Sequence, residues 1–308
     1  MKKKKETFFR KLWKQRAWVF LALPAFILLF MFDYMPMTGL VLAFKNFNYT
    51  DGLYNSPWCG LNNFRFLFQS APTFIRIIRN TVAYYVIFTV VDVILCVGIA
   101  IAINELVFKR WGKFTQSCMI LPTFISYIAI SFIAYLFLAN NGLLNSIRGF
   151  FGLAPVNWYL TPKPWWLILT IVHVWKGVGY GSVLYLSALT GVDQQMYEAA
   201  ALDGATGWQK IRYITLPMLV PMITTMVLLG LGNVLHSDTG LFYQVTKNSG
   251  FLMSSTQVMD SYVLNAIDTG VNFSSTAAVS LLQSVIGMIL VVVTNLIVRR
   301  QAPENALF

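Results

Sequence analysis

Polar side chains inside long apolar runs are the candidates for chemistry in this sequence. His173, Gly177 and Tyr180 are spaced so that a helix would place all three on one face, and Lys176 lies beside them. Polar groups are costly inside a membrane span and therefore mark candidate functional sites. A buried cation requires an anionic partner, so Lys176 is expected to pair with Asp92 of an earlier run or with a carboxylate on a bound ligand. The earlier run carries a stripe on one helical face that consists of Thr81, Tyr85, Phe88 and Asp92.

Three glycines follow His173 in the same run. Gly177, Gly179 and Gly181 leave space for either a ligand or a neighbouring helix. Close helix packing is the commoner use of such small residues.

Several catalytic motifs are missing from the sequence. It has no G-x-x-x-x-G-K-[ST] phosphate-binding loop, so we do not expect this chain to hydrolyse ATP. Cys59, Cys96 and Cys118 are scattered, and the sequence shows no spacing typical of a metal site or of a Ser-His-Asp triad. The sequence therefore predicts a chain that is not an enzyme and has no cofactor or metal of its own.

The composition indicates an all-α integral membrane protein. Of 308 residues, 57% are hydrophobic and 11% are charged, with a mean hydropathy of +0.62, so one soluble core could not bury the apolar side chains. A span needs about 20 mostly apolar residues. The first run follows a basic tail but is too long for a signal peptide, so we expect an uncleaved span. The six predicted spans are 18–44, 81–104, 115–138, 165–189, 216–235 and 277–298.

Basic residues set the expected orientation of these spans. Fifteen Lys and Arg residues fall on one side of them and seven on the other. Cytoplasmic loops carry the excess of positive charge, so both termini and the segment between the fourth and fifth spans are predicted to be cytoplasmic. The predicted organisation is a basic cytoplasmic tail over residues 1–17 and a six-helix transmembrane domain over residues 18–308.

A mostly polar segment, residues 193–217, is set between two of the apolar runs. Asp193 is a suitable N-cap for a short helix that begins at Gln194, and Gly204 is expected to end that helix. Thr206 is expected to cap a second helical piece. These signals predict a helix–turn–helix bracket on the membrane surface, and an ordinary loop is the alternative that they leave open.

The same segment carries a motif at fixed spacing. The residues E-A-A at 198–200, then three residues, Gly204, nine residues and I-x-L-P at 214–217 resemble the EAA signature of bacterial ABC-importer permeases. The D-G-A run at 203–205 resembles the carbohydrate-importer form of that signature. Residues 60–64 and 80–81 resemble sugar-importer permeases, and residues 276–300 resemble the last span of the oligosaccharide branch that includes the LplB-type and aldouronate-type permeases.

This resemblance implies a type I ABC-importer permease fold and a carbohydrate substrate. The bracket, near residues 193–205, would be the coupling helix that docks on a separate ATPase. The implied partners are a second permease subunit in a heterodimer, two ATPase subunits that bind ATP and Mg, and an extracytoplasmic solute-binding protein. The implied location is the plasma (inner) membrane of a bacterium. The expected ATPase-coupling residues are Glu198, Ala199, Ala200, Asp203, Gly204 and Ala205.

The resemblance also implies a substrate path. In maltose-type importers the sugar contacts come from the spans just before and just after the bracket. This sequence departs from the maltose pattern because His173 and Lys176 stand where an amide and an apolar residue would be expected. An oligosaccharide that contains uronic acids and a neutral one therefore both stay open. The expected substrate-path residues are His173, Lys176, Gly177, Tyr180, Asn233, Val234 and Ser237.

Two other classes of function are weaker alternatives. An ion-coupled secondary transporter acting alone would usually show an inverted repeat, which we do not find in the sequence, and would need an ionisable relay. A membrane-embedded enzyme would need paired acidic or histidine residues at a membrane face, whereas Asp33, Asp92 and Asp260 are isolated in the sequence.

The predicted outer segments carry signals of their own. Residues 61–79 are typical of an amphipathic helix. An interfacial aromatic belt is the simplest interpretation of Trp158, Tyr159, Trp165 and Trp166, with stacking on a sugar ring as the alternative. The polar stretch 236–275 is predicted to be either a landing surface for a binding protein or a loop that packs over the helices.

Overall fold

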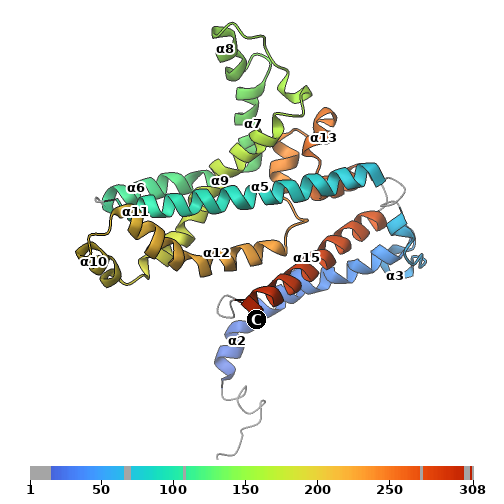
Figure 1. The fold of residues 1–308 in the computed structure, drawn as a ribbon. Coiled ribbons are helices and arrows are strands. Elements are labelled where there is room, and N and C mark those ends of the chain that lie inside the picture. Colours follow the sequence, from blue (N-terminus) through green and yellow to red (C-terminus); the bar gives the residue numbers. More distant parts are fainter. Residues whose placement is uncertain (1–14, 66–70, 107–108, 271–272, 302–305, 307–308) are drawn as a thin grey trace, which may run out of the picture. The chain divides into compact units, whose positions relative to one another are not determined.

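The computed structural model describes residues 15–65, 71–106, 109–270, 273–301 and 306. They fall into two compact units, one made of the described residues up to 65 with 273–281 and the other of the described residues from 71 to 270 with those from 282 onward. The elements in the described ranges are helices, accompanied by one isolated bridge between Lys45 and Trp58 (Figure 1). Six helices are long and apolar enough to cross a membrane, which confirms the predicted number of spans.

The first unit contains the first apolar helix, which runs from α2 (Arg16–Leu29) through a π-helical turn, η1 (Phe30–Tyr34), to a 3-10 segment, η2 (Met35–Phe44). No side chain of α2 is buried, as expected for a helix that faces lipid. After η2 the unit continues through α3 (Gly52–Asn55) and η3 (Asn62–Phe64).

Hydrogen bonds from two side chains fix the loop that follows η2. Asn63 Nδ2 donates to the carbonyls of Ala43 and Lys45, at 3.0 and 2.8 Å, and so satisfies the end of the 3-10 segment. The ammonium of Lys45 donates in turn to the carbonyl of Tyr54 in α3. In this unit Asn63 therefore holds the loop at 60–64 against the end of η2.

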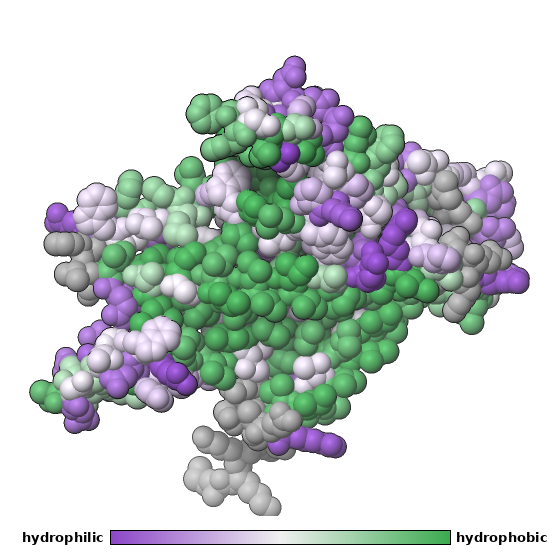
Figure 2. All heavy atoms as spheres, turned by 45° about the horizontal axis from the view of Figure 1, so that its top comes forward, coloured by the Kyte–Doolittle hydropathy of each residue, from purple (hydrophilic) through white to green (hydrophobic). Residues whose placement is uncertain are grey.

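The second unit is organised around α5 (Ala71–Asn104) and α9 (Trp165–Thr190), which lie side by side (Figure 1). The last apolar helix, α15 (Phe273–Gln301), begins in the first unit and continues in the second. Figure 2 shows hydrophobic residues spread over a broad area of the helical surface, as expected for spans that face lipid. The remaining elements are α6 (Lys109–Ile120), η4 (Leu121–Phe124), α7 (Tyr127–Leu138), α8 (Leu143–Phe150), η5 (Trp158–Leu160), α10 (Gln194–Leu202), α11 (Gly207–Lys210), η6 (Ile211–Thr215), α12 (Leu216–Leu231), η7 (Gly240–Val245), η8 (Gly250–Leu252), α13 (Met253–Thr256) and α14 (Met259–Asp268).

The predicted third span, 115–138, is broken in the structure. α6 ends at Ile120, a short 3-10 turn carries Pro122, and the backbone is extended at Ile125 and Ser126 before α7 begins. Proline disrupts a continuous helix because it has no N–H and its ring crowds the preceding turn. Ser126 then starts α7 as an N-cap whose side chain accepts from the amide of Ala129.

The second span is longer than predicted, and the separate amphipathic helix at 61–79 does not form as expected. Residues 71–79 are the first turns of α5, and 66–70 lie outside the described residues. Asn80 and Thr81 lie in the first third of this helix and hold the stretch after α12 against it. Asn80 Nδ2 donates to the carbonyls of Ser254 and Gln257, and Thr81 Oγ1 accepts from the amide of Met259.

The predicted aromatic belt is wrong for two of its members, which belong to the protein interior. Trp165 is fully buried, and Trp166 stacks on Tyr84 with ring centroids 4.1 Å apart. The stretch after α12 also packs inward, since Leu241 and Val258 are buried in the same apolar cluster. The helices and the 236–275 stretch thus share one core, which agrees with the packing interpretation of that stretch.

A second apolar cluster lies further along α5 and α9. It includes Cys96 and Ala100 of α5 and Val178 of α9, with Leu219 of α12 packed against them. The polar residues of α5 and α9 fall between these two clusters, so the apolar packing on either side positions them.

Candidate functional site

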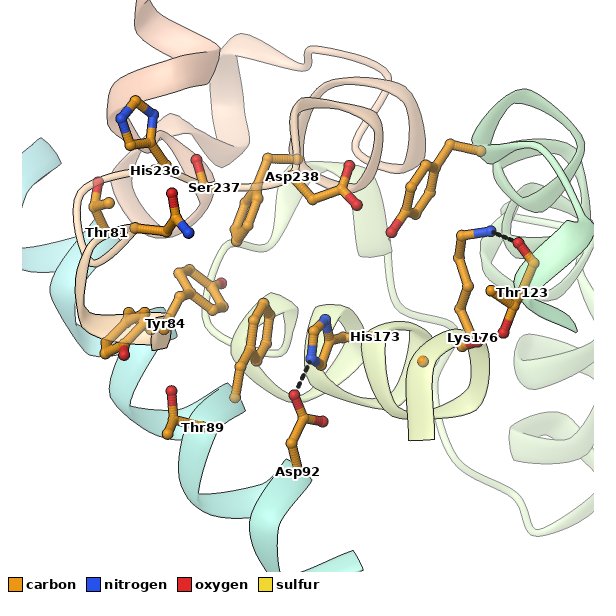
Figure 3. Close-up of a pocket in the computed structure, with 17 residues that line it drawn as sticks. Thr81, Tyr84, Thr89, Asp92, Thr123, His173, Lys176, His236, Ser237 and Asp238 are labelled. Atoms are coloured by element: carbon orange, nitrogen blue, oxygen red, sulfur yellow. Dashed lines mark hydrogen bonds and ion pairs between the residues drawn. The ribbon is translucent and has the colours of Figure 1, made fainter. Parts of the chain in front are cut away.

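A cavity of about 420 Å³ lies in the second unit between the two apolar clusters. Its walls come from α5, from η4 and the start of α7, from α9, and from the chain that follows α12 (Figure 3). All four residues of the predicted stripe on α5 contribute to it. Five of the seven expected substrate-path residues line it, namely His173, Lys176, Gly177, Asn233 and Ser237.

Tyr180 and Val234 do not line this cavity. A smaller cavity of about 190 Å³ continues along α9 past Gly177 and Gly181, so the lined face of α9 turns toward Gly181. Tyr180 is left 58% exposed on another side of the helix, and Val234 is 7% exposed and packs in the interior. The helical spacing counted from His173 therefore correctly placed Gly177 at the cavity. It wrongly placed Tyr180 there, because Gly181 lines the next turn instead.

Asp92 and His173 join α5 to α9 at the cavity wall. His173 Nε2 lies 2.9 Å from Asp92 Oδ2 (Figure 3). The imidazole also stacks on Phe88, with ring centroids 3.9 Å apart and planes inclined by 5°. Because the ring is held on two sides, the pair presents fixed hydrogen-bonding groups to whatever occupies the cavity.

The expected ion pair between Asp92 and Lys176 is replaced by a different arrangement. The ammonium of Lys176 donates to the carbonyls of Thr123 and Ile125, at 2.8 and 2.6 Å, and lies 4.8 Å from the centre of the Tyr127 ring (Figure 3). The physical reason is the break in the third span, which leaves backbone carbonyls beside Lys176 without helical partners. These oxygens satisfy the ammonium, and Asp92 is bound by the imidazole instead.

Two of the three glycines of α9 allow close helix packing, and the third leaves space at the cavity. A Cβ at Gly179 would collide with the backbone carbonyl of Met119, and one at Gly181 would crowd the Sγ of Cys96. These two glycines allow α6 and α5 to approach α9 closely. A Cβ at Gly177 would meet nothing within 4 Å, and this glycine borders the cavity.

Three polar atoms at the cavity wall are buried without a hydrogen bond to any described residue. They are Tyr84 Oη and Asp92 Oδ1, and the hydroxyl of Tyr85, which also lines the cavity, is a third. A buried unsatisfied polar atom costs about 1–3 kcal/mol, and such atoms are rare in folded proteins. Their gathering at one wall favours a binding role for the cavity over simple packing.

A charged cluster lies just beyond the end of α12, beside the same cavity. Asp260 accepts from the amide of Ser237, from Gln283 Nε2 at 3.1 Å and from His236, whose Nδ1 lies 3.4 Å away. The hydrogen bond to Asp260 raises the pKa of His236 above its ordinary value. Burial raises the pKa of Asp260, but the hydrogen bonds from His236, Ser237 and Gln283 outweigh it and leave this pKa below its ordinary value. Among the described side chains, neither this cluster nor another brings together three His, Cys, Asp or Glu residues that could hold a metal ion.

The predicted bracket forms between α9 and α12. Asp193 caps α10, and its side chain accepts from the amide of Gln195 at 3.0 Å. Gly204 adopts φ +79°, a left-handed conformation that glycine reaches without strain, and so ends the helix. Thr206 and Gln209 form a reciprocal capping box at the start of α11.

The expected coupling residues lie on the exposed surface of this bracket. Ala200, Asp203, Gly204 and Ala205 line a shallow hollow of about 350 Å³ together with residues of α11 and η6. Leu202 is 90% exposed and Trp208 is 68% exposed beside it, although the segment is otherwise polar. Large exposed apolar side chains within a polar segment are typical of a protein-binding surface.

The sequence reasoning missed several residues of the cavity. Thr123 and Tyr127 come from the broken third span, and His236 and Asp238 come from the chain after α12. The proline at 122, followed by Thr123 and Ser126 in an otherwise apolar run, was a signal for the break. The contact between the segment after α12 and α5 could not be predicted from residue spacing, because it depends on the tertiary fold.

Helices that span a membrane, a polar cavity between them and an exposed polar bracket define a membrane transport protein. Residues 94–304 match the family described as binding-protein-dependent transport system inner membrane component, and the chain belongs to this family.

Two curated relatives extend the similarity to nearly the whole chain. The polygalacturonan/rhamnogalacturonan transport system permease protein YteP of Bacillus subtilis (strain 168) is 30% identical over 306 residues, which cover 99% of this chain and 94% of that protein. Protein LplB of the same organism is 29% identical, over 95% of this chain and 92% of that protein.

Two solved structures share the fold. One is of a bacterial ABC transporter involved in the import of the acidic polysaccharide alginate, with a TM-score of 0.84 and 30% identity over 95% of this chain and 99% of that chain. The other is of a bacterial alginate ABC transporter in complex with an alginate pentasaccharide-bound periplasmic protein, with a TM-score of 0.85 and 28% identity over 96% and 98% of the two chains.

The chain is therefore a permease subunit of a carbohydrate ABC importer, a multi-pass protein of the bacterial inner membrane and not an enzyme. These findings confirm the predicted family and the predicted all-α, six-span permease fold.

Proposed function

We propose that this chain forms half of a translocation pore together with a second permease subunit, and that the cavity between α5, α9 and the chain after α12 is its part of the substrate path. The observation that carries this proposal is the set of polar groups that converge on one cavity between two apolar clusters. Sugar hydroxyls need paired donors and acceptors, which Asp92, His173, Asn233 and Ser237 can supply.

The energy source in this proposal is a pair of separate ATPase subunits that bind ATP and Mg. The bracket would dock on one of them through Glu198, Ala199, Ala200, Asp203, Gly204 and Ala205, with Leu202 and Trp208 as apolar contacts. Support comes from the exposure of the bracket and from the absence of a phosphate-binding loop in the sequence. Both termini and the bracket would then be cytoplasmic, as the distribution of basic residues indicates.

Transport would follow from movement of the bracket. α10 lies between the last turn of α9 and the first turns of the fifth span, so a displacement of the bracket shifts both helices that border the cavity. Closure of the ATPase pair would turn the cavity toward the outer side, where an extracytoplasmic binding protein delivers the substrate. Reopening would turn it toward the cytoplasm.

The substrate in this proposal is an oligosaccharide that contains uronic acids. The printed names of the relatives support it, because polygalacturonan and alginate are transported by two of them. The cavity also carries two histidines and a lysine among its lining residues. A neutral oligosaccharide would offer this lysine hydroxyl oxygens to bind but no opposite charge.

Co-purification tests this proposal. The chain would be solubilised in detergent, its partners identified, and the ATPase activity of the complex measured. We expect a second permease and an ATPase in the complex, and we expect the ATPase to be lost when Glu198 and Gly204 are both substituted. A chain that purifies alone, or an ATPase that remains bound to the substituted chain, would contradict the proposed coupling.

A further inference from the structure

Lys176 is held in an unusual environment for a lysine in a membrane span. Its ammonium has three N–H groups, and two of them donate to the carbonyls of Thr123 and Ile125. Thr123 Oγ1 donates back to the carbonyl of Lys176 at 2.8 Å, so the contact is reciprocal. The extended backbone at Ile125 directs these carbonyls away from helical pairing. The broken span therefore fixes the position of the ammonium without neutralising its charge.

The carboxylates that line the cavity are engaged elsewhere. Asp92 pairs with His173, at 2.9 Å. Asp238 accepts from the amide of Leu241 at 3.3 Å and hydrogen-bonds with the side chain of Tyr127. The centre of the Tyr127 ring lies 4.8 Å from the ammonium of Lys176. Within the described part of the cavity, the hydrogen bonds of Lys176 end on neutral oxygens.

The two histidines of the cavity do not supply a second unpaired positive charge like that of Lys176. His173 faces Asp92, and His236 faces Asp260, so each imidazole has a carboxylate of its own. Lys176 thus supplies a positive charge that no carboxylate of the described cavity wall neutralises, together with one N–H that is left for a ligand. Charge-assisted hydrogen bonds to carboxylates are stronger than neutral ones.

We propose that Lys176 is the residue through which the cavity selects acidic over neutral oligosaccharides, with the broken third span holding its ammonium toward the substrate carboxylate. This inference rests on the proposed function and adds the residue that determines specificity. The competing explanation is that Lys176 only satisfies the carbonyls of the break. The two explanations predict different results when Lys176 is replaced. A purely structural role would lower uptake of acidic and neutral substrates equally, whereas a role in selection would lower uptake of the acidic substrate more.

The test uses the complete importer with its binding protein in proteoliposomes and two matched probes. One probe is a short oligogalacturonide, and the other is its methyl ester, which has the same backbone without the charge. Lys176→Gln keeps donors for the carbonyls and removes the charge. Lys163→Gln removes an equivalent charge from an exposed site outside the cavity. The same binding protein delivers both probes to every variant, so a change in the uptake ratio reports on the permease.

We expect Lys176→Gln to lower the ratio of acid to ester uptake on the order of 10- to 100-fold. Lys163→Gln should leave the ratio unchanged, and Lys176→Arg should keep most of it. An equal loss for both probes, or an unchanged ratio, would overturn the inference and leave the proposed function intact. The wild-type complex alone also tests the inference, even if the Lys176→Gln variant does not assemble. Uptake of the ester as fast as the acid by the wild-type complex would overturn the inference. A wild-type complex that takes up neither probe would overturn the proposed substrate class, and this inference with it.

Discussion

The bracket and the cavity are built in opposite ways. The capping contacts of the bracket join residues two or three positions apart, such as Asp193 with Gln195 and Thr206 with Gln209, and the hydrogen bond between Tyr197 and Thr215 also stays within the segment, 18 positions apart. The cavity joins Asp92 to His173, which are 81 positions apart, and Ser237 to Asp260, which are 23 apart. The bracket can therefore form from local sequence, whereas the cavity exists only when the whole second unit is folded.

This difference suits the bracket and the cavity to different roles. A bracket with locally satisfied caps and an exposed surface can move as a unit without losing its own hydrogen bonds. A cavity with walls from four segments changes shape when any one of them shifts. Movement at the bracket can thus be converted into a change at the cavity, which is what a coupled permease requires.

The largest expected effect comes from breaking the turn of the bracket. Gly204 has φ +79°, and proline is restricted to about −65°, so Gly204→Pro should abolish uptake by the complete importer while the protein remains in the membrane. Gly204→Asn is the matched control, because asparagine tolerates the left-handed region. Uptake and membrane protein level would be measured together. Loss of the protein itself would show that the bracket is a folding element.

Close packing beside the cavity should be the next most sensitive feature. Gly179→Ala places a methyl group against the backbone of Met119 and should cost about 1–3 kcal/mol of unfolding free energy. Gly177→Ala, two residues away, adds the same group where there is space. Thermal unfolding of the purified chain in detergent would compare them. Equal melting temperatures would contradict the placement of α6 against α9.

A cap variant should have a smaller effect that stays within the bracket. Asp193→Ala removes the acceptor for the amide of Gln195 and should cost about 1 kcal/mol of local helix stability, with Asp193→Asn as the conservative control. Hydrogen exchange of the α10 amides should then increase about fivefold. Exchange in α5 and α9 should not change. Faster exchange there as well would refute the idea that the bracket is locally stabilised.

The smallest expected effect is the pH dependence of the cluster at the end of α12. The pKa of His236 is raised above 6.5, so its pairing contributes stability that is fully present below about pH 6.5 and is lost as the pH rises through the raised value. The lowered pKa of Asp260 adds stability that is present above about pH 3.8 and is lost as the pH falls through the lowered value. The melting temperature should therefore decline slightly toward alkaline pH.

His236→Gln removes the titrating group and should flatten that decline, while leaving the bracket unaffected. The imidazole is partly exposed, so solvent screening keeps the effect small. A His236→Gln chain with the wild-type slope of melting temperature against pH would assign the pH dependence to another group.

Much of the molecule was predictable because its signals are local. The caps of the bracket follow from Asp193, Gly204 and Thr206, and the number of spans follows from hydropathy. The placement of His173 and Gly177 on one cavity wall follows from helical periodicity. The motif residues at 60–64 and 80–81 were recognised without their contacts: Asn63 bonds to the end of η2, and Asn80 and Thr81 bond to the chain after α12.

The remaining features depend on tertiary contacts. Lys176 was expected to pair with Asp92, because the carbonyls released near Pro122 are visible only when the third span is seen to break. Trp165 was assigned to an interface, although it is buried against segments distant in the sequence. Tyr127 and Asp238 reach the cavity only through the fold.

The most direct test of the account is uptake of oligogalacturonide by proteoliposomes that contain this chain alone or the chain with its second permease, ATPase and binding protein. We predict uptake by the complete importer only, and only when ATP is supplied on the side of the bracket. Uptake by the chain alone without ATP would contradict the account and indicate an ion-coupled secondary transporter.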